Sequence, residues 1–121
     1  EIFQKIKSYE WGNTYYKGKM DLFYFFFHLG IDAIKNNGSL IYITTNYFIT
    51  ADGALKLRQD FKNRTNISEL INFNGAKIFE SALGQHNMIT RLVKSQNKLY
   101  STKVVIANQS LQYKLDNSSV F

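Results

Sequence analysis

A long apolar segment in the first third of the chain is interrupted by polar residues at helical spacing. Between Lys19 and Lys35 most positions are apolar, and the polar ones recur every three or four residues. This pattern predicts a helix over residues 19–35 that is buried around most of its circumference. Asn36-Asn37-Gly38 predicts its end, with Gly38 in the left-handed conformation that often closes a helix. The polar stripe consists of Asp21, Tyr24, His28, Asp32 and Lys35.

Short apolar runs rich in β-branched residues follow this helix and predict strands. Residues 39–45 form a continuous run that is typical of a central parallel strand. Residues 46–49 would form a loop at its carboxyl end, and Thr50 or Asp52 would cap a second helix that ends near Arg64. Further strands are predicted over residues 67–73, 86–94 and 103–108, with a loop over residues 74–85.

The order of these elements predicts an α/β fold. Helix, strand, helix, strand implies two parallel strands joined by a right-handed crossover. A direct return from the strand at 67–73 to the strand at 86–94 must be antiparallel. The loop over residues 74–85 is long for such a return, and long loops in compact domains tend to be functional. Residues 1–18 contain Gly12 and Gly18 among polar and aromatic residues and predict an irregular lead-in loop.

Composition narrows the possible classes of protein. The 121 residues suffice for one domain. Without cysteine there are no disulfides and no thiolate metal sites, and the two histidines lie too far apart in sequence to suggest a zinc site. No apolar run reaches the roughly 18 residues that a membrane span needs, and residues 1–20 lack a signal-peptide core. We therefore expect no membrane partner and a cytoplasmic location.

The positive charge is concentrated in the second half of the chain. Residues 1–60 carry 7 basic and 6 acidic side chains, whereas residues 61–121 carry 8 and 3. This excess of positive charge would suit a polyanionic partner such as nucleic acid. Alternatively, the charges only keep the surface soluble.

Five stretches in order resemble a known enzyme family. They are Lys-Gly-Lys-Met-Asp-Leu-Phe-Tyr-Phe-Phe (17–26), Asn-Gly-Ser-Leu-Ile-Tyr-Ile-Thr-Thr-Asn-Tyr-Phe (37–48), Ala-Asp-Gly-Ala-Leu-Lys-Leu-Arg (51–58), Ile-Asn-Phe (71–73) and Lys-Ile-Phe-Glu-Ser-Ala (77–82). Together they resemble the second half of the catalytic domain of adenine-N6 DNA methyltransferases from Type II and Type IIG restriction-modification systems, the TaqI-like group with an Asn-Pro-Pro-Tyr motif.

The resemblance implies a partial Rossmann-like sheet of an S-adenosylmethionine-dependent methyltransferase. Parallel strands would be joined by an antiparallel strand near one edge, with residues 39–45, 67–73 and 86–94 as the fifth, sixth and seventh strands of the family. Residues 1–121 would then be one fragment of a catalytic domain: a lead-in loop at 1–18, an α/β core at 19–94, and the start of a connection toward a target-recognition region at 95–121.

Two family motifs are absent from the sequence. The catalytic Asn-Pro-Pro-Tyr segment cannot be present because the chain has no proline, and none of its glycines forms a Gly-x-Gly pair. Thr44-Thr45-Asn46 stands where the family usually has Thr-Pro-Asn. We therefore expect no catalytic residue here and an inactive fragment. S-adenosylmethionine would be bound mainly by the rest of the parent chain. The resemblance leaves open whether that parent also carries a fused endonuclease.

The resemblance also assigns candidate site residues. Phe79 would stack on the extruded target adenine, or anchor its loop to the sheet; Phe26 would pack against the adenine ring of the cofactor, or lie in the core. Gln85, His86 and Asn87 suit hydrogen bonds to phosphates or base edges, or supply ordinary turn polarity. The cations of Lys77, Arg91 and Lys94, with Lys98 nearby, would contact phosphates of double-stranded DNA.

Other classes of function fit the same sequence. One is a non-enzymatic nucleic-acid-binding module on a degenerate methyltransferase scaffold. Another is a methyltransferase that acts on RNA or on a protein glutamine. The basic second half favours nucleic acid, whereas DNA rather than RNA follows from the resemblance alone.

Overall fold

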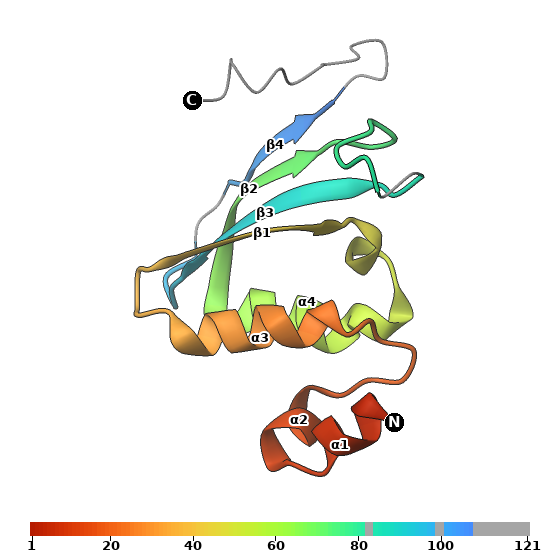
Figure 1. The fold of residues 1–121 in the computed structure, drawn as a ribbon. Helices are drawn as coiled ribbons and strands as arrows, with labels where there is room; N and C mark the ends of the chain where they lie inside the picture. Colours follow the sequence, from red (N-terminus) through yellow and green to blue (C-terminus); the bar gives the residue numbers. More distant parts are fainter. Residues whose placement is uncertain (82–83, 99–100, 108–121) are drawn as a thin grey trace.

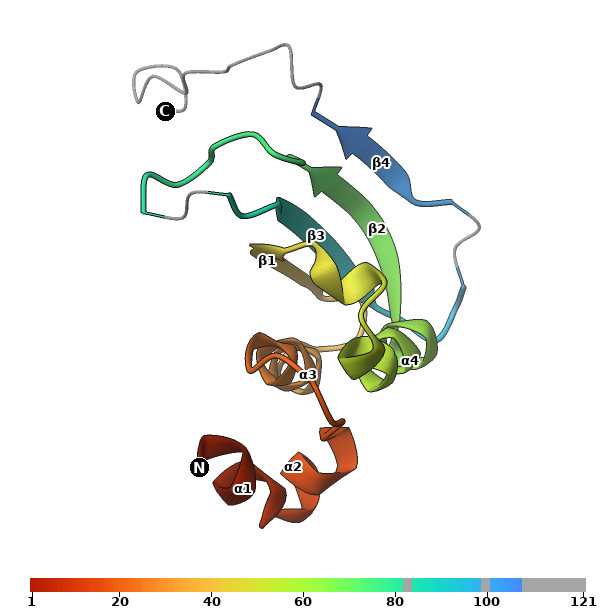
Figure 2. The same ribbon diagram turned by 90° about the vertical axis from the view of Figure 1, so that its right-hand side faces the viewer.

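The computed structural model describes residues 1–81, 84–98 and 101–107. One mixed sheet carries its helices on a single face (Figure 1). Two longer helices pack directly on the sheet, and two short ones lie beyond them, farther from the sheet (Figure 2). The strands are β1 (Ser39–Thr45), β2 (Thr65–Asn72), β3 (Asn87–Lys94) and β4 (Lys103–Ile106), and the helices are α1 (Ile2–Lys7), α2 (Glu10–Tyr15), α3 (Phe23–Ala33) and α4 (Leu55–Arg64).

The sheet has the mixed topology that the order of elements predicts. The strand order is β1-β3-β2-β4. β3 is antiparallel to both β1 and β2, so these two strands run in the same direction on either side of it. The prediction of a central parallel strand at residues 39–45 is wrong, because β1 lies at one edge of the described sheet and pairs with β3 alone. β4 adds to β2 in parallel. The predicted α/β fold with an inserted antiparallel strand is confirmed. The fourth predicted strand ends at Ile106, and the predicted residue 108 lies outside the described residues.

The core lies between the sheet and the pair α3 and α4. Alternate strand residues, such as Leu40 and Leu92, face the helices. On the helix side, Phe27 is fully buried and its ring lies within 6 Å of those of Tyr42, Phe48 and Phe61. These aromatic contacts bury large apolar areas and fix both helices against the strands.

The predicted lead-in loop is wrong, because residues 1–18 contain α1 and α2. Helices of six residues are unstable alone, so packing must hold them. Rings of Phe3 and Trp11 lie about 6 Å from that of Phe25 on α3. Gly12 lets the two short helices approach, since a Cβ there would meet the Ile6 carbonyl. These tertiary contacts cannot be predicted from the local sequence pattern.

The polar stripe of α3 is also misassigned by the sequence pattern. Tyr24 and His28, which belong to that stripe, are buried, whereas Phe26 and Leu29 are about half exposed. The helix is therefore not buried around most of its circumference. His28 faces inward because α2 and α4 supply aromatic and charged partners for it, whereas Asp21, Asp32 and Lys35 of the same stripe are exposed.

Three local details differ from the sequence prediction. The left-handed residue after α3 is Asn37, with φ of 65°, rather than Gly38. Neither Thr50 nor Asp52 caps α4 through its side chain. Instead, two 3-10 turns, η1 (Tyr47–Ile49) and η2 (Asp52–Ala54), lead into the helix, and Arg58 donates to the carbonyls of Phe48 and Ala51 at 2.9 and 2.7 Å. Among the described residues, no helix has the length and apolarity to cross a membrane.

Candidate functional site

The carboxyl ends of β1 and β2 meet at one edge of the sheet, where the loop between β2 and β3 also returns. Open α/β sheets bind ligands beyond the carboxyl ends of their parallel strands. The loop presents Phe79, whose residue surface is 41 % exposed, and an exposed Lys77. Phe79 is not among the buried core residues, so an aromatic face is available at this edge. We call this region the carboxyl edge.

The start of β3 adds polar groups to the carboxyl edge. Gln85 and His86 are exposed, and Asn87 is buried. The backbone N–H of Asn46, directly after β1, donates to the His86 carbonyl at 2.9 Å. This bond continues the ladder in which Thr45 pairs with Asn87. It brings the segment after β1 beside the segment before β3.

That pairing places Tyr47 next to His86, a contact that the sequence analysis did not predict. Tyr47 is 52 % exposed, and its ring centroid lies 6.4 Å from that of His86 with an angle of 29° between the planes. The available signal was the position of Tyr47, an aromatic residue directly after a parallel strand. The sequence pattern predicted only a loop over residues 46–49.

A group of amides underlies this edge. Asn72, at the end of β2, accepts through Oδ1 from the Asn46 side-chain amide at 3.2 Å and from the Asn74 backbone at 3.0 Å. By contrast, Asn87 Nδ2 and Thr45 Oγ1 are buried and have no hydrogen-bond partner within the part of the chain that the structure describes. Unmet donors in a protein interior are uncommon, and each one calls for an explanation.

The remaining predicted cations lie away from this edge. Arg91 is exposed in the middle of β3. Lys94 lies at the opposite end of β3, and its ammonium donates to the carbonyls of Ile31 and Ile34 at 2.8 and 3.0 Å. A cation at a helix C-terminus interacts favourably with the helix dipole, so Lys94 has a structural partner in α3. The structure thus brings Phe79, Lys77, Gln85, His86 and Asn87 to one edge and leaves Lys94 outside it.

Phe26 lies in the first half of α3 with 56 % of its surface exposed. The alternative that it is a core residue is therefore wrong. Its carbonyl accepts from the Tyr42 hydroxyl at 3.3 Å, which ties this part of α3 to β1. An exposed ring held by a fixed backbone can pack against a planar ligand, and the cofactor contact remains a prediction.

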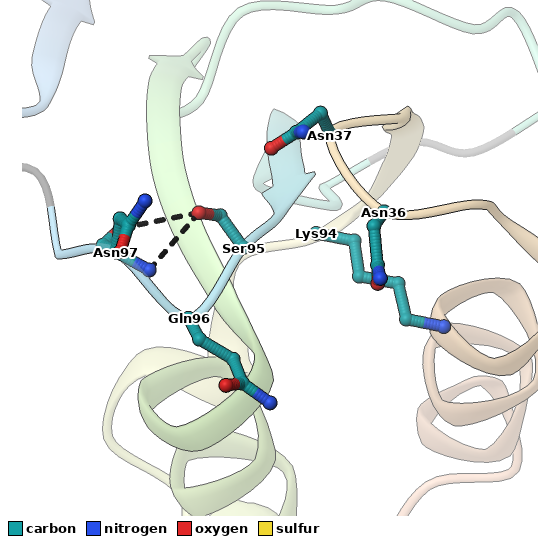
Figure 3. A pocket seen from close by; sticks show the side chains of 6 residues that line it. All are labelled: Asn36, Asn37, Lys94, Ser95, Gln96 and Asn97. Carbon is teal, nitrogen blue, oxygen red and sulfur yellow. Dashed lines mark hydrogen bonds between the residues drawn. The ribbon is translucent and has the colours of Figure 1, made fainter.

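A polar pocket lies at the far edge, where β1 begins and β3 ends. Its volume is about 330 Å³. Figure 3 shows Ser95 hydrogen-bonded to Asn97 and the Lys94 side chain extending toward α3. Lys94 is the one predicted site residue that lines it; the lining residues are Asn36, Asn37, Lys94, Ser95, Gln96 and Asn97. Across the described ranges, no three histidine or carboxylate side chains cluster as a metal site would require.

A partly buried charged cluster joins α2, α3 and α4: His28 and Asp60 are buried, whereas Asp32 and Arg64 are partly exposed. His28 Nδ1 lies 2.5 Å from Asp60 Oδ2, and Arg64 donates to Asp60 and to Asp32. Asp32 also accepts from the Trp11 indole at 2.6 Å. The Tyr15 ring is stacked on His28 with 3.9 Å between centroids. The contacts run between helices and fill the space between them, so the cluster holds α2 against α3 and α4.

The electrostatics of this cluster follow from its pairing. Burial tends to raise the pKa of Asp60, but hydrogen bonds from Arg64 and His28, together with their charges, lower it overall. The pKa of Asp32 is lowered in the same way by Arg64 and Trp11 against the effect of burial. Hydrogen bonding to Asp60 raises the pKa of Arg64 despite burial. Both carboxylates are therefore ionised at neutral pH and neutralised in part by one guanidinium.

The sheet and its helices have the fold of S-adenosylmethionine-dependent methyltransferases. A crystal structure from Listeria monocytogenes, assigned to class I of these enzymes, superposes with a TM-score of 0.68 at 16 % identity. The match covers 96 % of this chain and 34 % of that one, so the chain spans about a third of the matched protein. The profile of the Eco57I restriction-modification methylase family matches residues 2–79, and the chain belongs to that family.

Proposed function

We propose that this chain is part of a site-specific DNA methyltransferase that transfers a methyl group from S-adenosylmethionine to N6 of adenine in a restriction-modification system. Its membership of the restriction-modification methylase family supports the general reaction. The observation that carries the finer proposal is the exposed ring of Phe79 on the loop at the carboxyl edge. Its partial exposure leaves an aromatic face accessible to a ligand at this edge.

Phe79 would hold the target base. A methyltransferase cannot reach N6 inside a stacked duplex, so the nucleotide must rotate out into a pocket. The extruded base loses its stacking neighbours, and an aromatic side chain replaces part of that interaction, worth roughly 1–3 kcal/mol per base. Phe79 offers a flat apolar face for this role. The alternative, a loop anchor, would favour a buried ring.

Polar and basic groups around Phe79 would hold the DNA backbone. Lys77, Gln85 and His86 are exposed at the same edge. An ammonium, an amide and an imidazole can each donate to phosphate oxygens, and such contacts position a duplex without reading its sequence. Sequence reading would then be left to other parts of the protein.

S-adenosylmethionine supplies the methyl group when it is bound. Of the residues of this chain, Phe26 would pack its exposed ring against the adenine of the cofactor. The glycine loop and the Asn-Pro-Pro-Tyr segment of the resembled family have no counterpart in the sequence. The proposal therefore assigns cofactor binding and chemistry largely to residues outside this chain, and target-base contacts to this chain.

The test is methyl transfer by the full-length protein that contains this chain. Labelled S-adenosylmethionine is offered together with double-stranded DNA, structured RNA and a mixture of proteins in separate reactions. We expect label in DNA at least tenfold above the other two. Label mainly in RNA or protein would redirect the proposal to those substrates, and no transfer to any of them would support a binding module without activity.

A further inference from the structure

Tyr47 has no role in the site as described so far, although it is one of the most exposed aromatic residues at the carboxyl edge. Its ring lies in η1, immediately after β1, with 52 % of its surface exposed. The next residue, Phe48, is buried in the core, where its ring contacts Phe27 on α3 and Phe61 on α4 and anchors η1. Tyr47 is therefore held in place by its neighbour while its own ring remains accessible.

The backbone of His86, the residue whose ring lies beside Tyr47, is held by a hydrogen bond. The Asn46 N–H bond to the His86 carbonyl fixes the two segments to each other. With centroids 6.4 Å apart and planes inclined by 29°, the rings face in similar directions. Two exposed and nearly parallel rings on separate, hydrogen-bonded segments form a small aromatic surface. Planar nucleobases stack on such surfaces with little regard to sequence.

The adjoining strand residues have hydrogen-bonding capacity that the protein does not use. Asn87 follows His86 and Thr45 precedes Asn46, and the two are paired across β1 and β3. Asn87 Nδ2 and Thr45 Oγ1 lack a partner within the described residues, although both are buried. The neighbouring Asn46 amide, by contrast, is bonded to Asn72. A buried water that bridges the two atoms would satisfy this pair.

We propose that Tyr47 and His86 form a second base-contact surface, which holds an unstacked nucleotide adjacent to the one held by Phe79. Extruding one base leaves its neighbours with an uncovered face, and an aromatic surface at the same edge can cover it. The inference rests on the proposed function, because it takes DNA with a flipped base as the ligand.

The experiment uses the full-length protein and DNA with 2-aminopurine beside the target adenine, on either flank. Binding and fluorescence quenching are measured separately from methyl transfer. We expect Tyr47→Ala to weaken DNA binding about 5- to 150-fold, the range that corresponds to one lost base stack. Quenching of the flanking 2-aminopurine should also be lost. Tyr47→Phe keeps the ring and should restore both. Tyr9→Ala, which removes another exposed tyrosine, is the matched control.

The outcomes separate the two proposals. Wild-type methylation with unchanged binding and flank quenching in Tyr47→Ala overturns the second surface and leaves the proposed function standing. DNA binding that depends on Tyr47, without any methyl transfer, overturns the proposed reaction but supports the surface. A loss in Tyr47→Ala that comes with a lowered melting temperature and is not rescued by Tyr47→Phe contradicts a stacking role. A wild-type protein that does not bind DNA overturns both.

Discussion

Phe79 leaves about two-fifths of its surface in solvent on a loop that returns to the carboxyl edge. We expect Phe79→Ala in the full-length protein to lower the methylation rate or the flipped population about 5- to 150-fold, because alanine offers no face for stacking. Phe79→Trp should keep much of the activity, since indole also presents a face. Methylation rates and the fluorescence of 2-aminopurine at the target position measure these effects.

The same variants distinguish stacking from a packing role. If Phe79 anchors its loop, both substitutions should lower the melting temperature, and tryptophan should overpack the site. Its partial exposure instead predicts a melting temperature close to that of the wild type for both variants. An alanine variant that flips and methylates at the wild-type rate would end the stacking hypothesis.

Asp60 connects the partly buried charged cluster, because it contacts both His28 and Arg64. It faces His28 on one side and Arg64 on the other. Asp60→Ala leaves the buried His28 without its partner, and we expect a loss of about 3–5 kcal/mol in the free energy of unfolding at pH 7. Asp52→Ala is the matched control, because Asp52 is exposed and makes no cap hydrogen bond; it should change stability by less than about 0.5 kcal/mol. Urea unfolding measures both.

The lowered pKa of Asp60 also gives its contribution a pH dependence. A carboxylate with a lowered pKa in the folded state stabilises fully above its ordinary value of 3.8, and that contribution is lost as the pH falls through the lower folded value. The wild type should therefore lose more stability between pH 5 and pH 3 than Asp60→Ala does. Equal losses in the two proteins would mean that other carboxylates carry the acid sensitivity.

Single residues were the hardest level to predict from the sequence. Phe79 and His86 are exposed, and their roles in binding stay predictions. The pairing of His28 with Asp60 joins residues 32 positions apart, and no local pattern encodes it. The helical spacing correctly placed His28 on one face of α3. That His28 is buried there follows from the packing of α2 and α4, which the spacing does not show.

At the scale of elements, close backbone contacts set how the segment before α3 meets η2. Gly53 lies so close to the Lys19 carbonyl that a Cβ would approach its oxygen to 2.2 Å. We expect Gly53→Ala to shift this crossing and to reduce stability by about 1–3 kcal/mol, as overpacking against backbone does. Chemical denaturation of the purified protein measures the change.

Gly18 supplies the matched control, because nothing lies within 4 Å of a Cβ built there. Gly18→Ala should leave stability unchanged or raise it by up to about 1 kcal/mol through a less flexible unfolded chain. Two variants of similar stability would mean that the segment around Lys19 adapts freely and that the close contact at Gly53 does not constrain the fold.

Strands and their directions were predictable, whereas short helices were not. The predicted strands at 39–45 and 86–94 match β1 and β3 to within one residue, because short runs rich in apolar and β-branched residues favour strands. The antiparallel return followed from connectivity alone. α1 and α2 have six residues each and no cap hydrogen bond from a side chain. They exist through packing on Phe25 and through the charged cluster, which a local pattern cannot reveal.

At the scale of the whole molecule, one face of the sheet remains without helices across the described residues (Figure 2). Apolar side chains such as Ile41, Ile43 and Val105 are exposed there or at its edge. The chain also covers about a third of the matched methyltransferase structure. Both facts agree with a segment that works together with further polypeptide.

This arrangement predicts that the 121-residue chain by itself does not bind S-adenosylmethionine appreciably. Phe26 would supply one ring contact, and the glycine loop of the family has no counterpart in the sequence. A single aromatic contact is too little for measurable affinity once the cost of association is included. Calorimetry with the purified chain should give no heat of binding at millimolar cofactor. A micromolar dissociation constant would contradict the proposal that residues outside this chain bind most of the cofactor.

The central claim is methylation of adenine N6 in DNA by the protein that contains this chain. The most direct measurement is mass spectrometry of nucleosides from DNA treated with the full-length protein and isotopically labelled S-adenosylmethionine. The account predicts labelled N6-methyladenine, greatly reduced in the Phe79→Ala protein. Label in a methylated cytosine, or equal amounts of N6-methyladenine from the wild type and Phe79→Ala, would contradict it.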